Sequence, residues 1–303
     1  TSSQDWDTAA NWSLAAVPGS SMHDTDEVYI ENNSVPITTG LDDGGSPWVI
    51  ASLHIAQSYT GHIGTTSAYL EIDTANVDIG YNYEGQPTPG ASRIKLDLSG
   101  APTACDVVVH NSYNGLDNGR HPVQLLLNSA SSDLRVISGL VGIAAYNPGE
   151  TSTIGDITVE GGSVVCGSGV THSSSVATVS NGRLVIQSAH NSVIVSGGSF
   201  LKDGAGDLLE LKLNSGSATI RGTGALADYE ARGGIGIIDT TGTIGSMELK
   251  GGQTTIPQLA SGQSVSNAFY IEESATAIVH PGTLTLSNNI SITGRMRLIV
   301  ERV

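Results

Sequence analysis

Basic residues are missing from the first 92 positions, which hold twelve aspartates and glutamates but no lysine or arginine. All thirteen lysines and arginines lie between Arg93 and Arg302, and the formal net charge is −16. Nucleic-acid binding depends on cations that neutralise phosphates, so we expect no nucleic-acid partner. A basic protein surface or bound cations would suit the acidic front end better, unless the acidic surface only maintains solubility.

Cysteine is scarce, and long apolar runs are absent. Cys105 and Cys166 have no CxxC partner, which argues against a zinc site or a disulfide framework, and we expect both to be buried. The longest weakly polar run, 136–146, is shorter than the roughly 20 residues that span a bilayer. The segment that begins at Thr1 has neither the charged region nor the apolar region of a signal peptide. We expect synthesis in a cytoplasm and no membrane contact; a cleaved signal stays open.

Aromatic residues (5%) and charged residues (14%) are also few, whereas glycine is abundant, with 38 copies. An average soluble domain has about 25% charged residues. This composition suits closely stacked strands joined by tight turns, and it suits helices poorly.

A phrase of two alternating apolar residues followed by a glycine turn recurs in the second half, as in ITVEGG, LKLNSG and MELKGG. We take the second apolar residue as the anchor of each copy, and the anchors are 20, 16, 18, 18, 18 and 22 positions apart. A period of about 18 residues predicts a solenoid. The anchors are Val159, Val179, Val195, Leu213, Ala231, Leu249 and Ile271.

Two further columns support this alignment, because alternate residues of a strand face the same side. Two positions before the anchors, every residue is apolar or aromatic. Seven positions after them lies an isoleucine-rich column in which Lys202 is the exception, and we assign Lys202 to a register slip in the shortest repeat. That column is Cys166, Ile186, Lys202, Ile220, Ile238, Ile256 and Ile278. Each rung therefore has two main strands joined by a glycine turn.

The position just after each anchor is polar or small and mixed in charge, which favours a solvated face over a ladder of catalytic carboxylates. These residues are Glu160, Ser180, Ser196, Asn214, Arg232, Lys250 and Glu272.

We predict an all-β fold, a single-stranded parallel β-helix. Right-handed coiling is favoured. A left-handed hexapeptide helix needs an aliphatic residue at every sixth position, whereas the turns of this sequence vary in length by several residues. The predicted parts are an N-terminal cap over 1–50, the β-helix over 51–285 and a C-terminal strand or cap over 286–303. Further strands are predicted at 52–57, 69–72, 93–98, 106–111, 123–128 and 134–139. A β-sandwich is the structural alternative.

Both ends differ from the repeats, as a solenoid with exposed edges requires. All three tryptophans lie in the first 50 residues, where they would cap the first rung or dock onto another protein. The last 14 residues alternate as an amphipathic strand that a neighbouring subunit could exchange. The candidate partner-docking residues are Trp6, Trp12, Trp48, Arg295, Arg297 and Arg302.

Two resemblances rest on particular motifs. The phrase Trp6-x5-Trp12, with Asn11-Trp12-Ser13, Val17-Pro18 and Asp26-x-Val28-x-Ile30, is similar to the N-terminal phrase of autotransporter-associated and other bacterial surface proteins with β-strand repeats. Residues 37–64, the YLEI…VDIG pair and the later glycine-capped strands resemble phage-encoded β-helical head proteins. The second resemblance implies a homotrimeric cement or decoration protein on the outer surface of a capsid. Its partners would be the major capsid protein and further copies of itself.

No pattern indicates catalysis. Glycoside hydrolysis needs two carboxylates about 5 to 10 Å apart. The densest acidic group of the repeat region, Asp203, Asp207 and Glu210, lies in a glycine-rich turn without an aromatic neighbour. The eight histidines are dispersed, and GxSxG and GxxxxGK[ST] motifs are absent. We expect no enzymatic activity and no cofactor.

A metal site is not expected either. Asp24, Asp26 and Glu27 cluster as calcium ligands do, but the DxDxDG loop is missing.

The leading hypothesis is a non-enzymatic virion structural protein, a capsid cement or decoration protein that stabilises the phage head through many modest contacts. One alternative is a phage tailspike or another carbohydrate-binding or depolymerising β-helix, which a groove with paired acids and exposed aromatics would favour. The other is a bacterial surface or autotransporter passenger stalk, which would need a signal peptide and a membrane anchor in the full gene.

Overall fold

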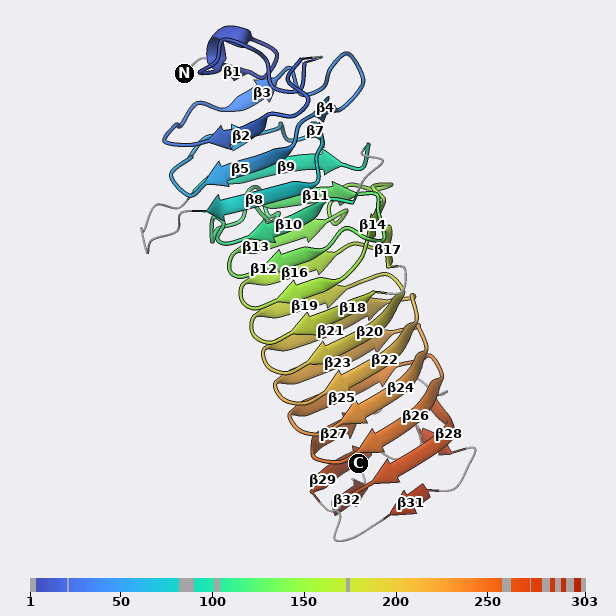
Figure 1. Cartoon of the computed structure of the whole chain (residues 1–303). Coiled ribbons are helices and arrows are strands. Elements are labelled where there is room, and N and C mark those ends of the chain that lie inside the picture. Colours follow the sequence, from blue (N-terminus) through green and yellow to red (C-terminus); the bar gives the residue numbers. More distant parts are fainter. Residues whose placement is uncertain are drawn as a thin grey trace. The chain divides into compact units, whose positions relative to one another are not determined.

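The computed structural model is an all-β protein whose parallel strands stack as a β-solenoid of about 11 turns (Figure 1). It describes residues 4–20, 22–81, 90–100, 104–172, 175–257, 263–272, 274–279, 284–286, 290–292 and 297–300. In these ranges the single helix is a three-residue 3-10 turn, η1 (Ala9–Asn11), so no described helix is long enough to cross a membrane. The prediction of a parallel β-helix is confirmed over a sandwich; its handedness stays a prediction.

The chain divides into two compact units, and unit 1 comprises residues 1–157 and 161–170. Its sheet A contains, in order, β1 (Gln4–Asp5), β3 (Ile37–Thr39), β6 (His62–Ile63), β9 (Arg93–Leu98), β11 (Val123–Leu127), β13 (Leu140–Ile143) and β16 (Ser163–Cys166). Its sheet B contains β2 (Glu27–Ile30), β5 (Ser52–Ala56), β8 (Asn76–Tyr81), β10 (Asp106–Val109) and β12 (Leu134–Val136). The short strands β4 (Trp48–Val49) and β7 (Leu70–Asp73) pair beside the main path of sheet A, and β14 (Ser152–Ile154) pairs with β17 (Val170–His172) in a separate two-stranded sheet. Each of the six segments predicted upstream of the repeats contains a strand.

Unit 2 comprises residues 158–160 and 171–303, and the division falls within β15 (Ile157–Val159) and β17 (Val170–His172). Its part of sheet A is β19 (Arg183–Ile186), β21 (Ser199–Gly204), β23 (Ser217–Gly222), β25 (Ile235–Thr240), β27 (Gly252–Ile256), β29 (Ala275–Val279) and β32 (Arg297–Val300). Its part of sheet B is β18 (Val176–Val179), β20 (His190–Val195), β22 (Leu208–Leu213), β24 (Leu226–Ala231), β26 (Ile244–Leu249), β28 (Gln263–Ile271) and β30 (Leu284–Leu286), with β31 (Ile290–Ile292) beside β28. From β22 to β25, six-residue strands alternate with three-residue turns, which gives the predicted 18-residue rung with two strands.

The predicted core columns are largely confirmed. All seven anchors and all seven residues two positions before them are buried. In the second column the register runs from Ile186 through Lys202 and Ile220 to Ile238, without a slip. The predicted slip at Lys202 is therefore wrong, and its side chain, 2% exposed, occupies an interior position between two isoleucines.

Ile278 was also assigned wrongly. It pairs with Thr255 and is only half-buried, whereas Val279 is the residue in register with Ile256. The turn between β28 and β29 is one residue longer than the turn between β26 and β27, which moves the inward position by one residue, and a count of positions could not reveal this. Alternation then sends the neighbouring Ala277 to the core instead.

A glycine ladder joins the two strands of successive rungs in unit 2 and consists of Gly182, Gly198, Gly216, Gly234 and Gly252. At Gly234 the φ of +77° is a conformation that other residues resist, and an added Cβ would lie 2.6 Å from the carbonyl oxygen of Gly216. Each turn thus rests directly on the backbone of the turn before it.

A polar island interrupts the core of unit 2. The rings of His172 and His190 meet edge to face, with 4.2 Å between their centroids, so two histidines that are far apart in the sequence are neighbours in space. Burial lowers the pKa of His172 to about 3, and the nearby His190 and Lys202 act in the same direction because like charges repel. The Nζ of Lys202 has no hydrogen-bond partner among the described residues, and burial lowers its pKa as well.

Candidate anion-binding site

The tryptophans near the N-terminus occupy different environments. Trp6 and Trp48 are 0% and 2% exposed, and their indole nitrogens donate hydrogen bonds to the carbonyl oxygens of Pro18 and Gly40. Neither presents surface to a partner, so the docking role predicted for these two is corrected to a packing role. Their places in the fold explain this. Trp48 is itself part of β4 and pairs with Ile72 of β7, and Trp6 directly follows β1 and donates its backbone N–H to the Thr39 carbonyl oxygen.

Trp12 is the tryptophan that stays a docking candidate. It is half-buried, packs edge to face on Trp6 at 4.7 Å and donates a hydrogen bond to the Trp6 carbonyl oxygen. Of the arginines, Arg297 lies in β32, while Arg295 and Arg302 lie outside the described residues.

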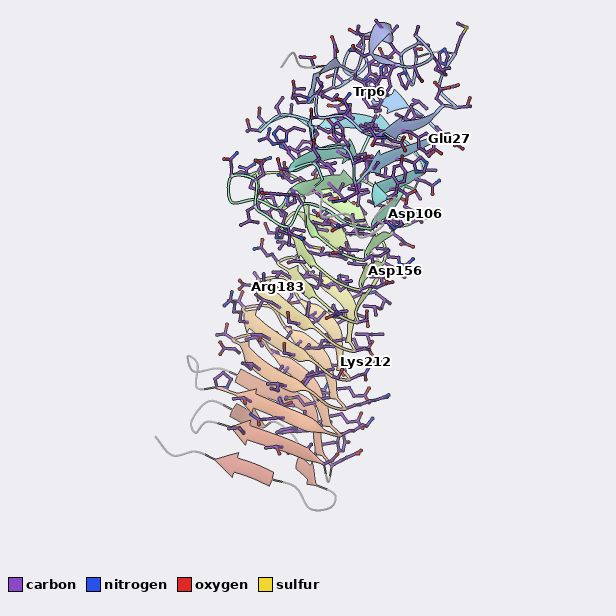
Figure 2. The ribbon with its side chains drawn as sticks, turned by 90° about the vertical axis from the view of Figure 1, so that its left-hand side faces the viewer. Trp6, Glu27, Asp106, Asp156, Arg183 and Lys212 are labelled. Carbon is purple, nitrogen blue, oxygen red and sulfur yellow. The ribbon has the colours of Figure 1, made fainter. Side chains whose placement is uncertain are left out.

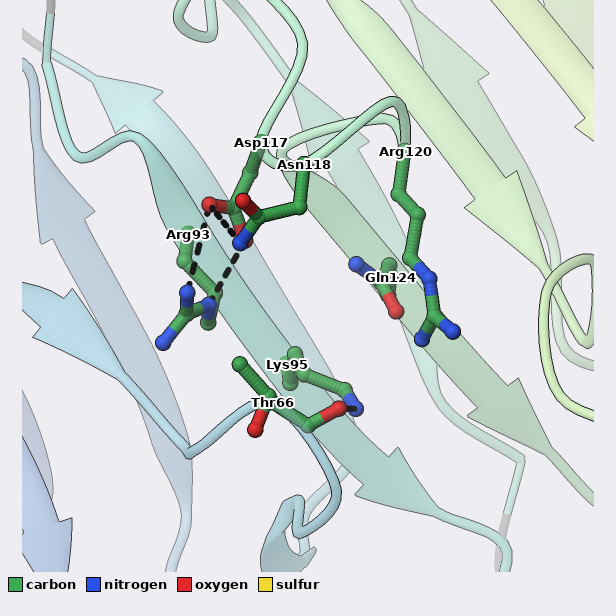
Figure 3. A pocket seen from close by; sticks show the side chains of 7 residues that line it. All are labelled: Thr66, Arg93, Lys95, Asp117, Asn118, Arg120 and Gln124. Carbon is green, nitrogen blue, oxygen red and sulfur yellow. Dashed lines mark hydrogen bonds and ion pairs between the residues drawn. The ribbon is translucent and has the colours of Figure 1, made fainter.

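The side chains that converge best in unit 1 were not predicted. A pocket of about 260 Å³ is lined by Thr66, Arg93, Lys95, Asp117, Asn118, Arg120 and Gln124 (Figure 3). Three cations and one carboxylate thus line a single hollow, in a unit whose first 92 residues contain no basic residue. We call this hollow the basic pocket.

Strand alternation forms the floor of the basic pocket. Ile94 and Leu96 of β9 face the core, so Arg93 and Lys95 point outward. Lys95 pairs in register with Gln124 of β11, which places the two side chains side by side. All five residues of β11 are buried, so its outward face is covered as well as its core face.

A tight turn forms one wall. Asp117 and Arg120 exchange two backbone hydrogen bonds of 2.9 Å, and Asn118 and Gly119 between them both have positive φ. This is the two-residue Asn-Gly turn that favours hairpin geometry. It brings Asp117 onto Arg93, whose Nε and Nη2 donate to the two carboxylate oxygens at 2.7 and 3.2 Å.

Lys95 is held by a cation–π contact and a hydrogen bond, and it has no ion pair within 4.0 Å among the described residues. Its side chain is 1% exposed, and its Nζ lies 4.1 Å from the centroid of the Tyr69 ring and donates to the Thr66 carbonyl oxygen at 3.2 Å. Burial lowers the pKa of Lys95, although the nearby Glu150 partly opposes this shift.

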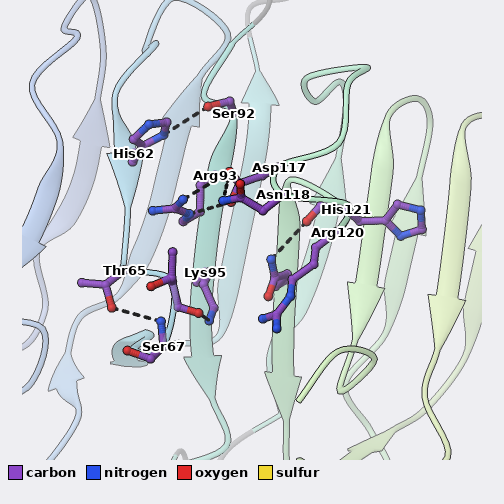
Figure 4. A network of polar contacts seen from close by, with 12 residues as sticks. His62, Thr65, Ser67, Ser92, Arg93, Lys95, Asp117, Asn118, Arg120 and His121 are labelled. Carbon is purple, nitrogen blue, oxygen red and sulfur yellow. Dashed lines mark hydrogen bonds and ion pairs between the residues drawn. The ribbon is translucent and has the colours of Figure 1, made fainter.

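Arg120 and Gln124 complete the site. Arg120 donates from Nη1 to the Asn147 amide oxygen at 2.8 Å, and its guanidinium lies 6.0 Å from the centroid of the Tyr146 ring. Gln124, 3% exposed, donates from its amide nitrogen to the His121 carbonyl oxygen at 3.2 Å, while its own amide oxygen has no partner in the described structure. Figure 4 shows the ion pair between Arg93 and Asp117 together with the hydrogen bond between His62 and Ser92.

A second cluster lies on the outward face of sheet B in unit 1. The Tyr29 and His54 rings stack at 4.7 Å, and the Tyr81 ring meets both edge to face. Asp78 joins His54 at 2.9 Å and His110 at 3.2 Å. These histidines, which the sequence appeared to scatter, therefore share one carboxylate.

A hollow of about 310 Å³ lies on sheet B of unit 2, lined by Glu210, Asp228, Glu230, Glu248, the exposed Tyr270 and four other residues. Hydrogen bonds from Lys212 and from Lys250 lower the pKa of Glu210 and of Glu230. Both groups are thus held as carboxylates, which suits them to accept hydrogen bonds better than to donate a proton.

Other carboxylates bind the backbone of neighbouring rungs. Asp106 accepts a hydrogen bond from the backbone N–H of Asp133, and Asp133 accepts one from that of Asp156. Figure 2 shows Asp106 and Asp156 on the same side of unit 1. In unit 2 the backbone N–H of Ala225 donates to Asp207, and Arg221 pairs with Asp203. Part of the acidity thus belongs to the turns of the solenoid.

Within the described ranges, no group of three or more histidine, cysteine, aspartate and glutamate side chains is arranged to hold a metal ion. Cys105 and Cys166 are free and buried, as predicted.

Comparisons with known proteins find no match among protein-family models, curated proteins or solved structures.

The basic pocket left two signals in the sequence. Arg93-x-Lys95 on an alternating strand places two cations on one face, and Asn118-Gly119 predicts a hairpin turn after it. The sequence does not show that residues 93–95 and 117–120 lie close together, because the register that joins β9 to β11 depends on the length of the loops between them.

Proposed function

We propose that this chain is a non-enzymatic structural protein of a virus particle, a cement or decoration protein on the outer surface of a phage capsid. Its partners would be the major capsid protein and two further copies of itself. The single observation that carries the proposal is the in-register repetition of β22 to β26, where equal rungs form a continuous strand-paired scaffold. The resemblance to phage-encoded β-helical head proteins supports it.

The charged residues on this scaffold fit a structural role. Lys212 pairs with Glu210 at 2.7 Å, and Lys250 with Glu230 at 2.6 Å, so these carboxylates are matched by cations on the same face. A charge-compensated face can lie against another protein without burying an unpaired charge. Many modest contacts, repeated over many copies, then add up to a stable lattice.

The composition of purified particles tests this proposal. Mass spectrometry of particles from the virus or organism that encodes the chain should find its peptides in a fixed ratio to the major capsid protein. Light scattering of the free protein should give three times the chain mass of 31.1 kDa. Particles that lack the protein would overturn the proposal, and a stable monomer would remove its trimeric part.

Docking through Trp12 can be tested on the same particles. Trp12→Ala should lower the occupancy of the protein on capsids, because aromatic side chains concentrate binding energy. Leu14→Ala is the matched control, since Leu14 is a fully described, exposed apolar residue of the same segment. Equal occupancy of the two variants would remove Trp12 from the interface.

A second candidate function is carbohydrate binding. The hollow on sheet B of unit 2 combines several carboxylates with the exposed Tyr270, and the aromatic cluster of unit 1 includes the exposed Tyr29. A glycan array separates this candidate from the first: binding that Tyr270→Ala abolishes supports it, and an array without any bound glycan counts against it.

A further inference from the structure

We propose that the basic pocket of unit 1 binds a hydroxy carboxylate, of the kind presented by a sugar acid. This inference does not depend on attachment to a capsid. It rests on the charge of the pocket, on an unsatisfied acceptor within it and on its size.

The charge of the pocket departs sharply from that of its surroundings. Unit 1 contains four lysines and arginines against 18 aspartates and glutamates, and three of the four basic residues line this one hollow. Asp117 is engaged by Arg93 through two hydrogen bonds, so Lys95 and Arg120 are left to meet an incoming anion. An anion bound there would offset part of the desolvation that Lys95 undergoes on burial.

Gln124 adds a requirement that an anion alone does not meet. The hydrogen bond from its amide nitrogen to the His121 carbonyl oxygen fixes the orientation of the amide, because a carbonyl oxygen only accepts. Its amide oxygen is therefore a buried acceptor without a donor in the described structure. Gln124 lines the pocket together with Lys95 and Arg120 (Figure 3).

Most buried acceptors pair with a protein donor or an ordered water, so a ligand that brings a donor of its own gains a hydrogen bond here. A carboxylate with a neighbouring hydroxyl group does so, because the carboxylate meets the cations and the hydroxyl donates to Gln124. An inorganic anion such as chloride, or a plain carboxylate, would leave the amide oxygen unpaired.

The size of the pocket limits the ligand. Its volume of about 260 Å³ lies just below the roughly 300 to 1,000 Å³ typical of sites for larger small molecules. One sugar ring with its carboxylate is therefore the expected occupant, either free or as one unit of a polymer.

Titration calorimetry on the full chain with three small probes tests the ligand chemistry. D-glucuronate carries both groups, D-glucose lacks the carboxylate, and cyclohexanecarboxylate lacks the hydroxyls. We expect glucuronate to bind at least about tenfold more tightly than either comparison probe. Glucose loses the charge-assisted hydrogen bonds to the cations, and cyclohexanecarboxylate leaves the buried amide oxygen of Gln124 unpaired. Equal affinity for all three, or no binding of glucuronate, would overturn the proposal.

Three variants locate the site. Gln124→Leu should lower glucuronate affinity about tenfold and leave cyclohexanecarboxylate binding unchanged, whereas Arg120→Gln should weaken both. Arg135→Gln is the control, because Arg135 is the remaining basic residue of unit 1 and does not line the pocket. Thermal unfolding of each variant confirms that it is folded. Loss of binding in Arg135→Gln to the same degree would place the ligand elsewhere.

Two polymers distinguish the sources of the carboxylate. Polygalacturonate should compete with glucuronate in the wild type and tenfold less well in Gln124→Leu. Polyglutamate presents carboxylates without neighbouring hydroxyls and should compete poorly. Strong competition by polyglutamate that is independent of Gln124 would assign the pocket to an acidic protein segment and overturn the sugar-acid proposal.

Discussion

The ammonium of Lys95 lies 4.1 Å from the centroid of the Tyr69 ring, and the Tyr69 hydroxyl donates to Glu150 at 2.6 Å. The ring therefore stabilises a buried cation directly, while its hydroxyl contacts a carboxylate that favours the same charge. Among the described residues, this arrangement and not an ion pair stabilises Lys95 in its buried position.

Replacement of Tyr69 separates these contributions. Tyr69→Phe removes only the hydroxyl and should lower the free energy of unfolding by about 1 kcal/mol. Tyr69→Leu also removes the cation–π contact and should cost about 1–2 kcal/mol more. Urea denaturation measures both changes, and equal losses would show that the ring contributes nothing to the placement of Lys95.

Lys202 is a buried cation in the isoleucine column, and an apolar residue of similar length should be more stable there. We expect Lys202→Met to raise the free energy of unfolding by about 1–3 kcal/mol at pH 7. Burial lowers the pKa of Lys202 in the folded protein below the ordinary 10.5. Between these two pKa values the folded wild type has lost the proton that the unfolded chain still binds, so the wild type becomes more stable as the pH rises and the gain from Lys202→Met should shrink. Lys212→Met, at a partly exposed and ion-paired lysine, is the control and should not stabilise.

His172 makes stability depend on pH. Its pKa in the folded protein is about 3, against 6.5 ordinarily, so the unfolded chain binds the extra proton between these values. The free energy of unfolding should fall as the pH decreases through this window, by at most about 1.4 kcal/mol per unit for this group. His172→Phe should flatten the profile relative to His23→Phe, measured as denaturation midpoints from pH 7 to pH 4. Parallel profiles for the two variants would contradict this assignment.

The two thiols report on the folding of unit 1. Burial raises the pKa of both Cys105 and Cys166 to about 12. At pH 8 the reactive thiolate is then on the order of one part in ten thousand. Ellman's reagent should detect no thiol in the native protein and two after denaturation. Rapid labelling of either cysteine in the native state would show that the structure around it opens locally.

The glycine ladder is sensitive to a single methyl group. Gly234→Ala should cost several kcal/mol, because the new Cβ would collide with the Gly216 carbonyl oxygen and the φ is positive. Gly149→Ala has a similar φ of +84° but meets no atom within 4 Å, so it should cost only about 1 kcal/mol. Thermal unfolding compares the two, and equal losses would mean that backbone strain alone governs the ladder.

The sequence predicted those parts of the fold that repeat. The alternation of Leu211 and Leu213, and the return of the same pattern 18 residues later at Tyr229 and Ala231, are local signals that each rung supplies anew. This repetition does not predict the polar residues inside the core. Lys202 is an exception within a regular column, and counting positions cannot distinguish a slipped strand from a buried charge.

The sequence does not predict the basic pocket, for a different reason. Arg93 and Lys95 lie on one strand, whereas Arg120 belongs to a loop of the following rung. Their meeting depends on how that loop folds back over the outward face of β11, and no periodic signal governs an irregular loop. The acidic composition of the first 92 residues also predicts basic partners outside the protein and gives no sign of the few cations within unit 1.

The equal rungs between β22 and β26 also bear on how such a chain can change its length. Residues 214–231 contain one turn, one strand, a second turn and a second strand, and they begin and end at equivalent points of the rung. A second copy inserted after residue 231 would meet the same neighbours on both sides. Tandem duplication of a short gene segment can therefore lengthen this protein in steps of one rung. Each step replaces the β23–β25 and β24–β26 pairs by equivalent pairs through the new copy.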